Sequence, residues 1–409
     1  MINTGKKPLP VLTYIAIMSV CFIINLPGVA IAPVEGSLRE LLHTPELEIQ
    51  LLTTLPNFVI IPFVFIAGTL SDYKHKIPLI ILSLLVFIGC GFLYIFTKTM
   101  TGLIIASCFL GAADGILIPF AMGFIVNAFD GKYRTRNLGI KSAVSNFGTV
   151  VASFVVGLLL IGSDWHLPFV VYLIAIVPLI LSYWLKYIPG FGFIDIDPTD
   201  FQKECIMQDS PKGINYGKIR FLMGNNAIFT FLTFSIVIYL PQLLQQMGES
   251  AKIAGWITGV FFISVLLSGF FLEHFIKFFK NMVYPILGFS LALGLFFFTY
   301  VHGEWSMYVG SIFSGLAFGI FQPLIYDKTS YAVSDPKKNI FGLSLVLCAL
   351  YIAIATEPFI ITGIAKLFRI NDENHFAFSL SFYVTLVYMV FAFIFRKRFI
   401  FSIEPTLYS

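Results

Sequence analysis

The chain has 409 residues, of which 58% are hydrophobic and only 12% are charged, and its mean hydropathy is +0.88. A water-soluble globule of this size needs far more polar residues to cover its surface. The composition therefore excludes a soluble enzyme or binding domain and predicts a polytopic membrane protein, and the net charge of +4 requires no nucleic-acid partner.

Apolar runs long enough to cross about 30 Å of hydrocarbon follow one another along the chain. We expect spans at about 10–33, 47–70, 77–97, 101–126, 138–161 and 167–187, then at 221–243, 253–275, 282–301, 306–326, 340–364 and 376–395. The predicted fold is all-α and integral to the membrane, with twelve transmembrane helices in two pseudo-symmetric six-helix bundles. These bundles are residues 1–187 and 219–409, joined by a polar cytoplasmic linker at 188–218.

The basic residues predict the orientation of the spans. If the N-terminus is cytoplasmic, 21 of the 26 Lys and Arg residues fall on the inner side. The other side keeps Arg39, Lys98, Lys252, Lys366 and Arg369. Because cytoplasmic loops carry an excess of Lys and Arg, both termini are expected in the cytoplasm. With these span boundaries, no Lys or Arg is expected near the middle of the membrane.

A short polar turn follows the second span and is repeated after the eighth. It contains Gly68, Asp72 and Lys76, and the same spacings return 201 residues later as Gly269, Glu273 and Lys277. A glycine allows two backbones to approach closely, and an acid can interact with the positive end of a facing helix. The recurrence indicates an internal repeat.

A second pattern supports the duplication. Gly111 and Gly115 in the fourth span are followed by Pro119, and the same spacing recurs 204 residues later at Gly315, Gly319 and Pro323. The two offsets differ by three residues, so the chain is predicted to consist of two homologous halves of roughly equal length.

Twelve spans in two halves, with a Gly-x-Leu-Ser-Asp-x-x-x-Lys turn after the second span, resemble the major facilitator superfamily over essentially the whole chain. The resemblance implies two halves around a central cavity that opens alternately to each side, and a turn that closes the cytoplasmic gate. It assigns these residues to the gate: Gly68, Asp72 and Lys76, with Glu273 and Lys277 as counterparts. Within the superfamily the chain resembles bacterial proton-coupled exporters of drugs and metabolites, although Ser107 stands where they often carry an arginine.

Two carboxyl groups lie deep inside predicted spans, where an ionised side chain is expensive and indicates function. Asp114 lies about 13 residues into the fourth span, flanked by Gly111 and Gly115, and Glu357 precedes Pro358 in the eleventh span. Burial favours the neutral form of a carboxyl group. Each is therefore a candidate for binding a proton or a cation, and the alternative is an acid that only pairs with a neighbouring helix.

Other polar residues are weaker candidates. Asp327, near the inner end of the tenth span, is predicted to belong to the cytoplasmic gate or to be an interfacial charge beside Lys328. Four uncharged residues are candidates for substrate contact or, alternatively, for interhelical hydrogen bonds: Asn25, Asn146, Tyr239 and Gln322. The five cysteines stand singly and the six histidines lack metal-ligand spacing, so neither a metal nor a cofactor is expected.

Acids without a base near the midplane favour cations and neutral amphipaths over anions. We therefore predict a monomeric inner-membrane (plasma-membrane) transporter that exports a small lipophilic or cationic compound in exchange for protons, by rocking of its halves. The alternative substrate is a neutral metabolite such as a sugar or a peptide-like compound. A transporter-like sensor is a different alternative, and an enzyme is not expected because no paired catalytic constellation occurs.

Overall fold

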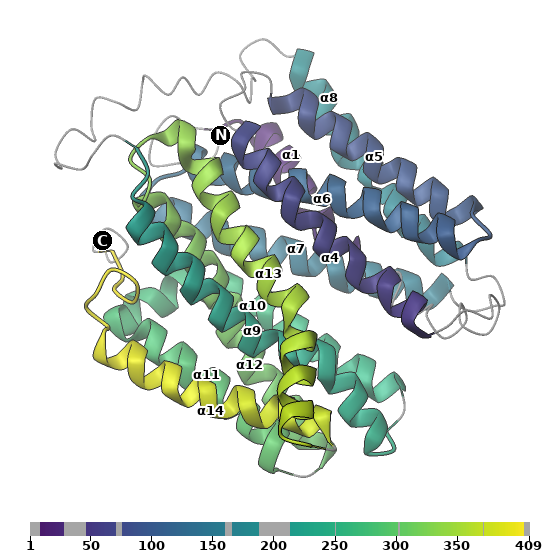
Figure 1. The fold of residues 1–409 in the computed structure, drawn as a ribbon. Coiled ribbons are helices and arrows are strands. Elements are labelled where there is room, and N and C mark those ends of the chain that lie inside the picture. Colours follow the sequence, from purple (N-terminus) through teal and green to yellow (C-terminus); the bar gives the residue numbers. More distant parts are fainter. Residues whose placement is uncertain are drawn as a thin grey trace.

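The computed structural model describes residues 9–27, 46–70, 76–159, 166–187, 213–249, 251–301, 303–370 and 372–404. Nearly all of these residues are helical (Figure 1). In the first part of the chain the helices are α1 (Val11–Ile23), α4 (Glu46–Thr69), α5 (Lys76–Phe96), α6 (Met100–Ala128), α7 (Gly131–Leu159), the 3-10 helix η3 (Leu167–Ala175) and α8 (Ile176–Tyr187). The second part contains α9 (Tyr216–Gln246), α10 (Ala251–Phe279), η5 (Lys280–Met282), α11 (Val283–Tyr300), α12 (Glu304–Tyr331), η6 (Pro336–Lys338), α13 (Asn339–Leu367) and α14 (Glu373–Ile394).

Within the described residues, eight stretches are long and apolar enough to cross a membrane. One of them, Ile253–Tyr300, contains both α10 and α11. Shorter apolar helical stretches lie at Val11–Ile23, Thr54–Thr69 and Leu167–Tyr183. The predicted all-helical membrane fold is confirmed at this level.

Two helices begin earlier than the hydropathy predicted. α7 begins at Gly131 instead of 138, and α9 begins at Tyr216 instead of 221. Hydropathy marks only the part of a helix that is apolar, whereas the backbone hydrogen bonds of α7 and α9 continue through polar turns. Several basic residues that were predicted to lie in loops are therefore helical.

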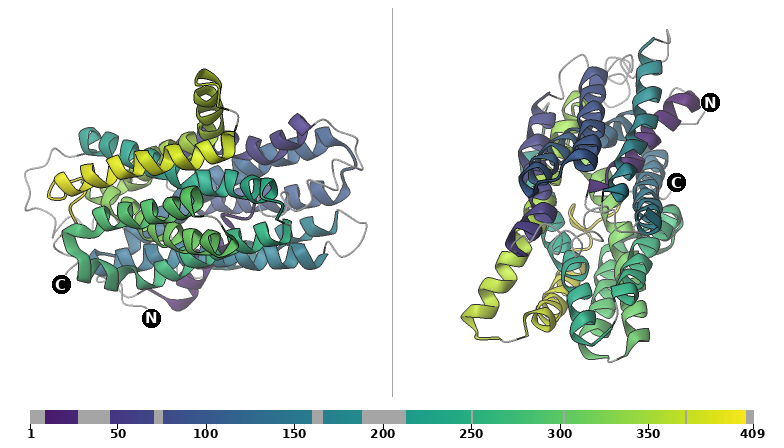
Figure 2. Two further views of the ribbon diagram at one scale, coloured as in Figure 1. Left: turned by 90° about the horizontal axis from the view of Figure 1, so that it is seen from below. Right: turned by 90° about the vertical axis from the view of Figure 1, so that its right-hand side faces the viewer.

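The helices form two sets that follow one another in the chain. The N-terminal set comprises α1 to α8, in which α4 and α5 both pack on α6. The C-terminal set comprises α9 to α14, in which α12 packs on α10 and α11. Figures 1 and 2 show the purple-to-blue helices grouped together and the green-to-yellow helices grouped together.

The repeated glycines make the same contact in both sets. A Cβ built on Gly111 of α6 would lie 2.6 Å from the carbonyl oxygen of Pro56 in α4. A Cβ built on Gly315 of α12 would lie 2.5 Å from the carbonyl oxygen of Phe261 in α10. The second glycine of each pair makes an equivalent approach one helical turn later. Each helix pair thus approaches closely where a side chain would prevent it, as is typical of packing between membrane helices.

The two sets meet through another repeated pair of glycines. Gly68 of α4 packs on Ser344 of α13, and Gly269 of α10 packs on Gly139 of α7. Both contacts lie near the end of the helices where α6, α12 and α4 end and α7 and α13 begin. We call this the basic end, because most of the Lys and Arg residues were predicted on this side.

The chain folds back across the basic end after α14. Phe401 is buried, and its ring meets Tyr284 at 5.7 Å and Tyr388 at 5.9 Å between centroids, edge to face. The ammonium group of Lys328, also buried, donates a hydrogen bond to the carbonyl oxygen of Ser402. The residues that follow α14 therefore pack against the end of α12 and against other helices of the C-terminal set.

Substitution of Gly111 tests whether these close approaches stabilise the fold. Gly111→Ala is expected to lower the thermal midpoint of the purified protein, because overpacking against the α4 backbone costs about 1–3 kcal/mol. Gly89→Ala on α5 is the matched control, since no atom lies within 4 Å of its added Cβ and alanine is about 1 kcal/mol more favourable than glycine in a helix. Equal midpoints for the two variants would contradict the packing role of Gly111.

Candidate functional site

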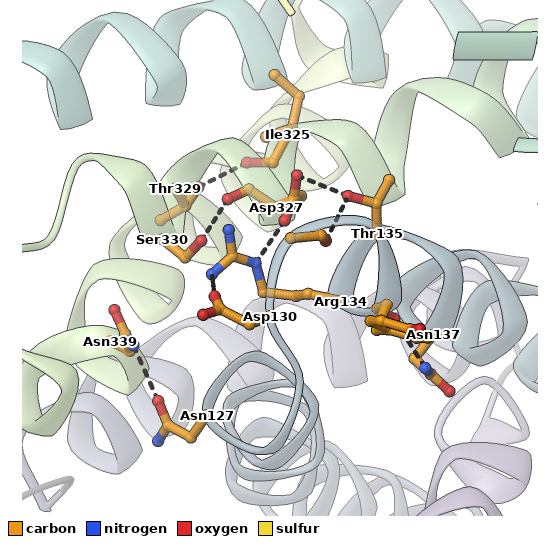
Figure 3. A network of polar contacts seen from close by, with 12 residues as sticks. Asn127, Asp130, Arg134, Thr135, Asn137, Ile325, Asp327, Thr329, Ser330 and Asn339 are labelled. Atoms are coloured by element: carbon orange, nitrogen blue, oxygen red, sulfur yellow. Dashed lines mark hydrogen bonds and ion pairs between the residues drawn. The ribbon is translucent and has the colours of Figure 1, made fainter. Parts of the chain in front are cut away.

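A buried ion pair joins the two helix sets at the basic end (Figure 3). Arg134, in the first turn of α7, donates from Nε to Oδ1 of Asp327 in α12 at 2.6 Å. The hydroxyl of Thr135 donates to Oδ2 of the same carboxylate at 2.9 Å. Asp327 thus accepts from two neighbouring residues of the other set and is buried rather than solvated, whereas its predicted role in the cytoplasmic gate stays a prediction.

Further groups surround the guanidinium of Arg134. It stacks over the ring of Tyr331 at 4.5 Å and lies 3.6 Å from a carboxylate oxygen of Asp130, which precedes α7. The side chains of Arg134 and Asp327 are only 9% and 2% exposed. Removal of one partner from such a buried pair leaves an uncompensated charge, which costs about 3–5 kcal/mol.

A neutral hydrogen bond lies beside the ion pair. Asn339, at the start of α13, donates from Nδ2 to Oδ1 of Asn127 in the last turn of α6 at 2.8 Å (Figure 3). This bond also joins the two sets, since α6 and α13 belong to different ones. The basic end is thus closed by polar contacts as well as by the glycine approaches.

The repeated polar turn is only partly described. Gly68 lies at the contact between α4 and α13, whereas Asp72 lies outside the described residues. Lys76 is the first residue of α5, and its side chain is also outside the description. In the second copy, Lys277 donates to Glu273 at 3.0 Å within α10, and both side chains are partly exposed.

Asp114 lies at the middle of α6, about 21 Å from either end at 1.5 Å per residue. It is 1% exposed, and its Oδ1 atom has no hydrogen-bond partner among the described residues. Groups from three other elements interact electrostatically with it: Lys141 of α7, Tyr172 of η3 and Tyr351 of α13. Because Tyr351 belongs to the C-terminal set, Asp114 lies where the two sets face each other.

Lys141 overturns one expectation from the sequence. It was predicted at the inner end of a span, but α7 begins seven residues earlier, so Lys141 lies ten residues, or about 15 Å, inside the helix. The expectation that no base occurs near the middle of the spans is therefore wrong. Lys141 lies within electrostatic range of Asp114, so the negative bias predicted for the central region is reduced.

Glu357 lies within the C-terminal set. Its Oε1 atom accepts a hydrogen bond from Ser235 of α9 at 2.6 Å, and Ser235 also contacts Ser381 of α14 at 2.9 Å. The carboxyl group is fully buried, and its second oxygen has no hydrogen-bond partner among the described residues. The structure thus does not bring Glu357 together with Asp114.

The four uncharged candidates are dispersed. Asn25 is exposed in the turn after α1, and Asn146 donates to the carbonyl of Ser142 in its own helix at 2.7 Å. Gln322 is buried in the C-terminal set and donates to Asn226 and Thr230, each at 3.2 Å. Tyr239 is 4% exposed and interacts electrostatically with Glu357. Ser107, which replaces the arginine of the exporters, is buried and hydrogen-bonded to Tyr94.

Arg134 and Lys141 were missed as functional candidates because both were predicted outside the core of a span. Two sequence signals point to their true position. Asp130 is a residue type that favours the position before the first turn of a helix. Arg134, Asn137, Lys141 and Ser145 then recur every three or four residues, which places them along one side of a helix.

Replacing Asp327 tests the role of the ion pair. Asp327→Asn is expected to separate the two sets at the basic end, because it leaves the buried Arg134 without its counter-charge. The separation can be measured between spin labels attached through Arg136→Cys and Lys337→Cys, both exposed positions, in a background without the five native cysteines.

The double variant Arg134→Met with Asp327→Leu provides the control for that measurement. Replacing both charges by apolar groups removes the desolvation cost as well as the attraction, so the short distance should return. An unchanged distance distribution in Asp327→Asn would show that the pair does not hold the sets together.

Comparison with known proteins agrees with this architecture. A model of the Major Facilitator Superfamily matches residues 13–197. The quinolone resistance protein NorA of Staphylococcus aureus is 22% identical over 298 residues, which cover 71% of this chain and 73% of that protein. The structure of the proton:xylose symporter XylE, bound to 6-bromo-6-deoxy-D-glucose, superimposes with a TM-score of 0.70 at 14% identity and covers 95% of each chain.

A further structural similarity concerns the transporter FucP in its outward conformation. It has a TM-score of 0.68 at 13% identity and covers 93% of this chain and 99% of that one. The family match, the repeated glycine contacts and the shared fold lead to one conclusion. The chain is a multi-pass membrane transporter, not an enzyme, with the fold of the major facilitator superfamily, whose model matches residues 13–197.

Proposed function

We propose that this transporter exports a small lipophilic or cationic compound in exchange for protons. Asp114 carries the proposal, because it is a carboxyl group at the middle of α6, buried, with one oxygen that has no hydrogen-bond partner among the described residues. A buried ionisable group inside a membrane-spanning helix indicates a proton or substrate site. The similarity to a quinolone resistance protein supports export of a drug-like compound.

In the proposed cycle, twelve spans form two six-helix bundles, 1–187 and 219–409, that rock about a central site. The basic end faces the cytoplasm. The ion pair of Arg134 and Asp327 holds it closed, and Gly68, Asp72, Lys76, Glu273 and Lys277 act with that pair in the gate. The close packing of α4 on α13 and of α7 on α10 supports this assignment.

Proton exchange follows from competition at Asp114. A bound cationic group and a proton both neutralise its carboxylate, so arrival of one favours release of the other. Among the described residues, the titratable groups near this site are Cys21 of α1, Lys141 of α7, Tyr172 of η3 and Tyr351 of α13. Glu357 is proposed as a second proton-binding group inside the C-terminal set.

A neutral metabolite such as a sugar is the second candidate substrate. The structural similarity to a proton:xylose symporter supports it. Under this alternative, Asn25, Asn146, Tyr239 and Gln322 are the proposed polar contacts. The direction of coupling to the pH gradient separates the two: a cation exporter moves its substrate opposite to the proton, whereas a proton symporter of a neutral compound moves both in the same direction.

Asp114→Asn is expected to abolish flux of the lipophilic cation ethidium driven by an imposed pH gradient, because the amide cannot exchange a proton. Flux is measured in proteoliposomes, and a retained gel-filtration profile confirms that the variant is folded. Glu249→Gln, which alters a carboxyl group beyond the end of α9, is expected to leave the flux unchanged. Proton-driven flux at the wild-type rate in Asp114→Asn would rule out this residue as the coupling site.

A further inference from the structure

Lys141 is an unusual residue for the interior of a membrane-spanning helix. One turn before it, Asn137 accepts a hydrogen bond from the hydroxyl of Tyr14 in α1 at 2.9 Å. One turn after it, Ser145 donates to the carbonyl oxygen of Cys21, also in α1, at 2.7 Å. Since residues three and four apart share a helix face, Lys141 lies on the face of α7 that is turned toward α1.

The charge of Lys141 is only loosely matched. Asp114 lies within electrostatic range of it, yet no ion pair within 4.0 Å joins Lys141 to any carboxylate in the described ranges. In the Arg134–Asp327 pair, by contrast, the nitrogen and oxygen atoms are in direct contact, 2.6 Å apart. Asp114 and Lys141 instead lie within electrostatic range of each other, and Oδ1 of Asp114 has no hydrogen-bond partner among the described residues.

We propose that Asp114 and Lys141 together bind a zwitterionic amphiphile, with its ammonium group on Asp114 and its carboxylate on Lys141. Such a compound places one charge against each residue and brings no net charge into the protein. A compound with one charge contacts only one of the two residues, so it is expected to bind less tightly than the zwitterion. The proposal rests on the proposed function, because it narrows the compound that competes with the proton at Asp114.

The surrounding groups fit this assignment. In the part of the chain that the structure describes, three further titratable groups interact with Asp114 or Lys141: Cys21 of α1, Tyr172 of η3 and Tyr351 of α13. The hydroxyl of Tyr172 is already engaged, since it donates to the carbonyl oxygen of Pro27 at 2.6 Å. Tyr351 comes from the C-terminal set, so rocking of the sets changes what covers Asp114.

Three probes that share one fluorophore test the proposal. ε-Dansyl-lysine is a zwitterion, its methyl ester is a cation, and its Nα-acetyl derivative is an anion. In detergent at fixed pH, we expect the zwitterion to bind the wild-type protein at least about tenfold more tightly than either analogue, because each analogue loses one charge-assisted contact. Dansyl fluorescence reports the affinity of each probe.

The variants assign each contact to a residue. Lys141→Gln should weaken binding of the zwitterion about tenfold and leave the methyl ester unchanged, whereas Asp114→Asn should leave the acetyl derivative unchanged. Lys141→Arg keeps the charge and should keep the preference for the zwitterion. Lys98→Gln, at an exposed position between α5 and α6, is the matched control and should behave as wild type.

Equal affinities for the three probes, no binding of the zwitterion by folded wild-type protein, or no effect of Lys141→Gln would each overturn the proposal. The binding assay contains no proton gradient. The two proposals can therefore fail separately. If the wild-type protein still prefers the zwitterion but pH-driven flux of ε-dansyl-lysine is unchanged in Asp114→Asn, only the proposed function is contradicted.

Discussion

A charge buried away from water must be matched by an opposite charge or by hydrogen bonds. In this transporter one such match, between Arg134 and Asp327, joins helices that belong to different sets. Because both side chains are buried, separation of the two sets would leave each charge without its counter-charge. The pair is therefore costly to separate, and the glycine contacts of α4 with α13 and of α7 with α10 provide the close fit around it.

The two buried charged sites of the protein differ in how completely their charges are matched. At the basic end the opposite charges are in direct contact, and further donors satisfy the carboxylate. Between α6 and α7 they lie near each other without contact, and an oxygen of Asp114 is left without a hydrogen-bond partner in the described part of the chain. A matched pair suits a contact that holds helices together, whereas an incompletely matched pair suits a site that exchanges partners.

The architecture is duplicated, but the chemistry is not. The glycine approaches of α6 on α4 return in α12 on α10 with nearly the same offset in sequence. At the position in α12 that corresponds to Asp114, however, stands Phe318. The repeat thus supplies two similar scaffolds, whereas the carboxyl group of Asp114 has no counterpart at the equivalent position of the second one.

Composition, hydropathy and the repeated motifs were enough to predict a helical membrane transporter of this superfamily, because these signals are local: an apolar run of sufficient length must be helical in hydrocarbon. The importance of Asp114 was also visible, since an acid in an apolar run is conspicuous. The position of Lys141 near it was not predicted, because the first turns of α7 are polar and hydropathy does not distinguish them from a loop. Which charges meet depends on helix starts and rotations that arise only when the helices pack, and so the tertiary structure alone decided that Arg134 binds Asp327 and that Lys141 lies within electrostatic range of Asp114.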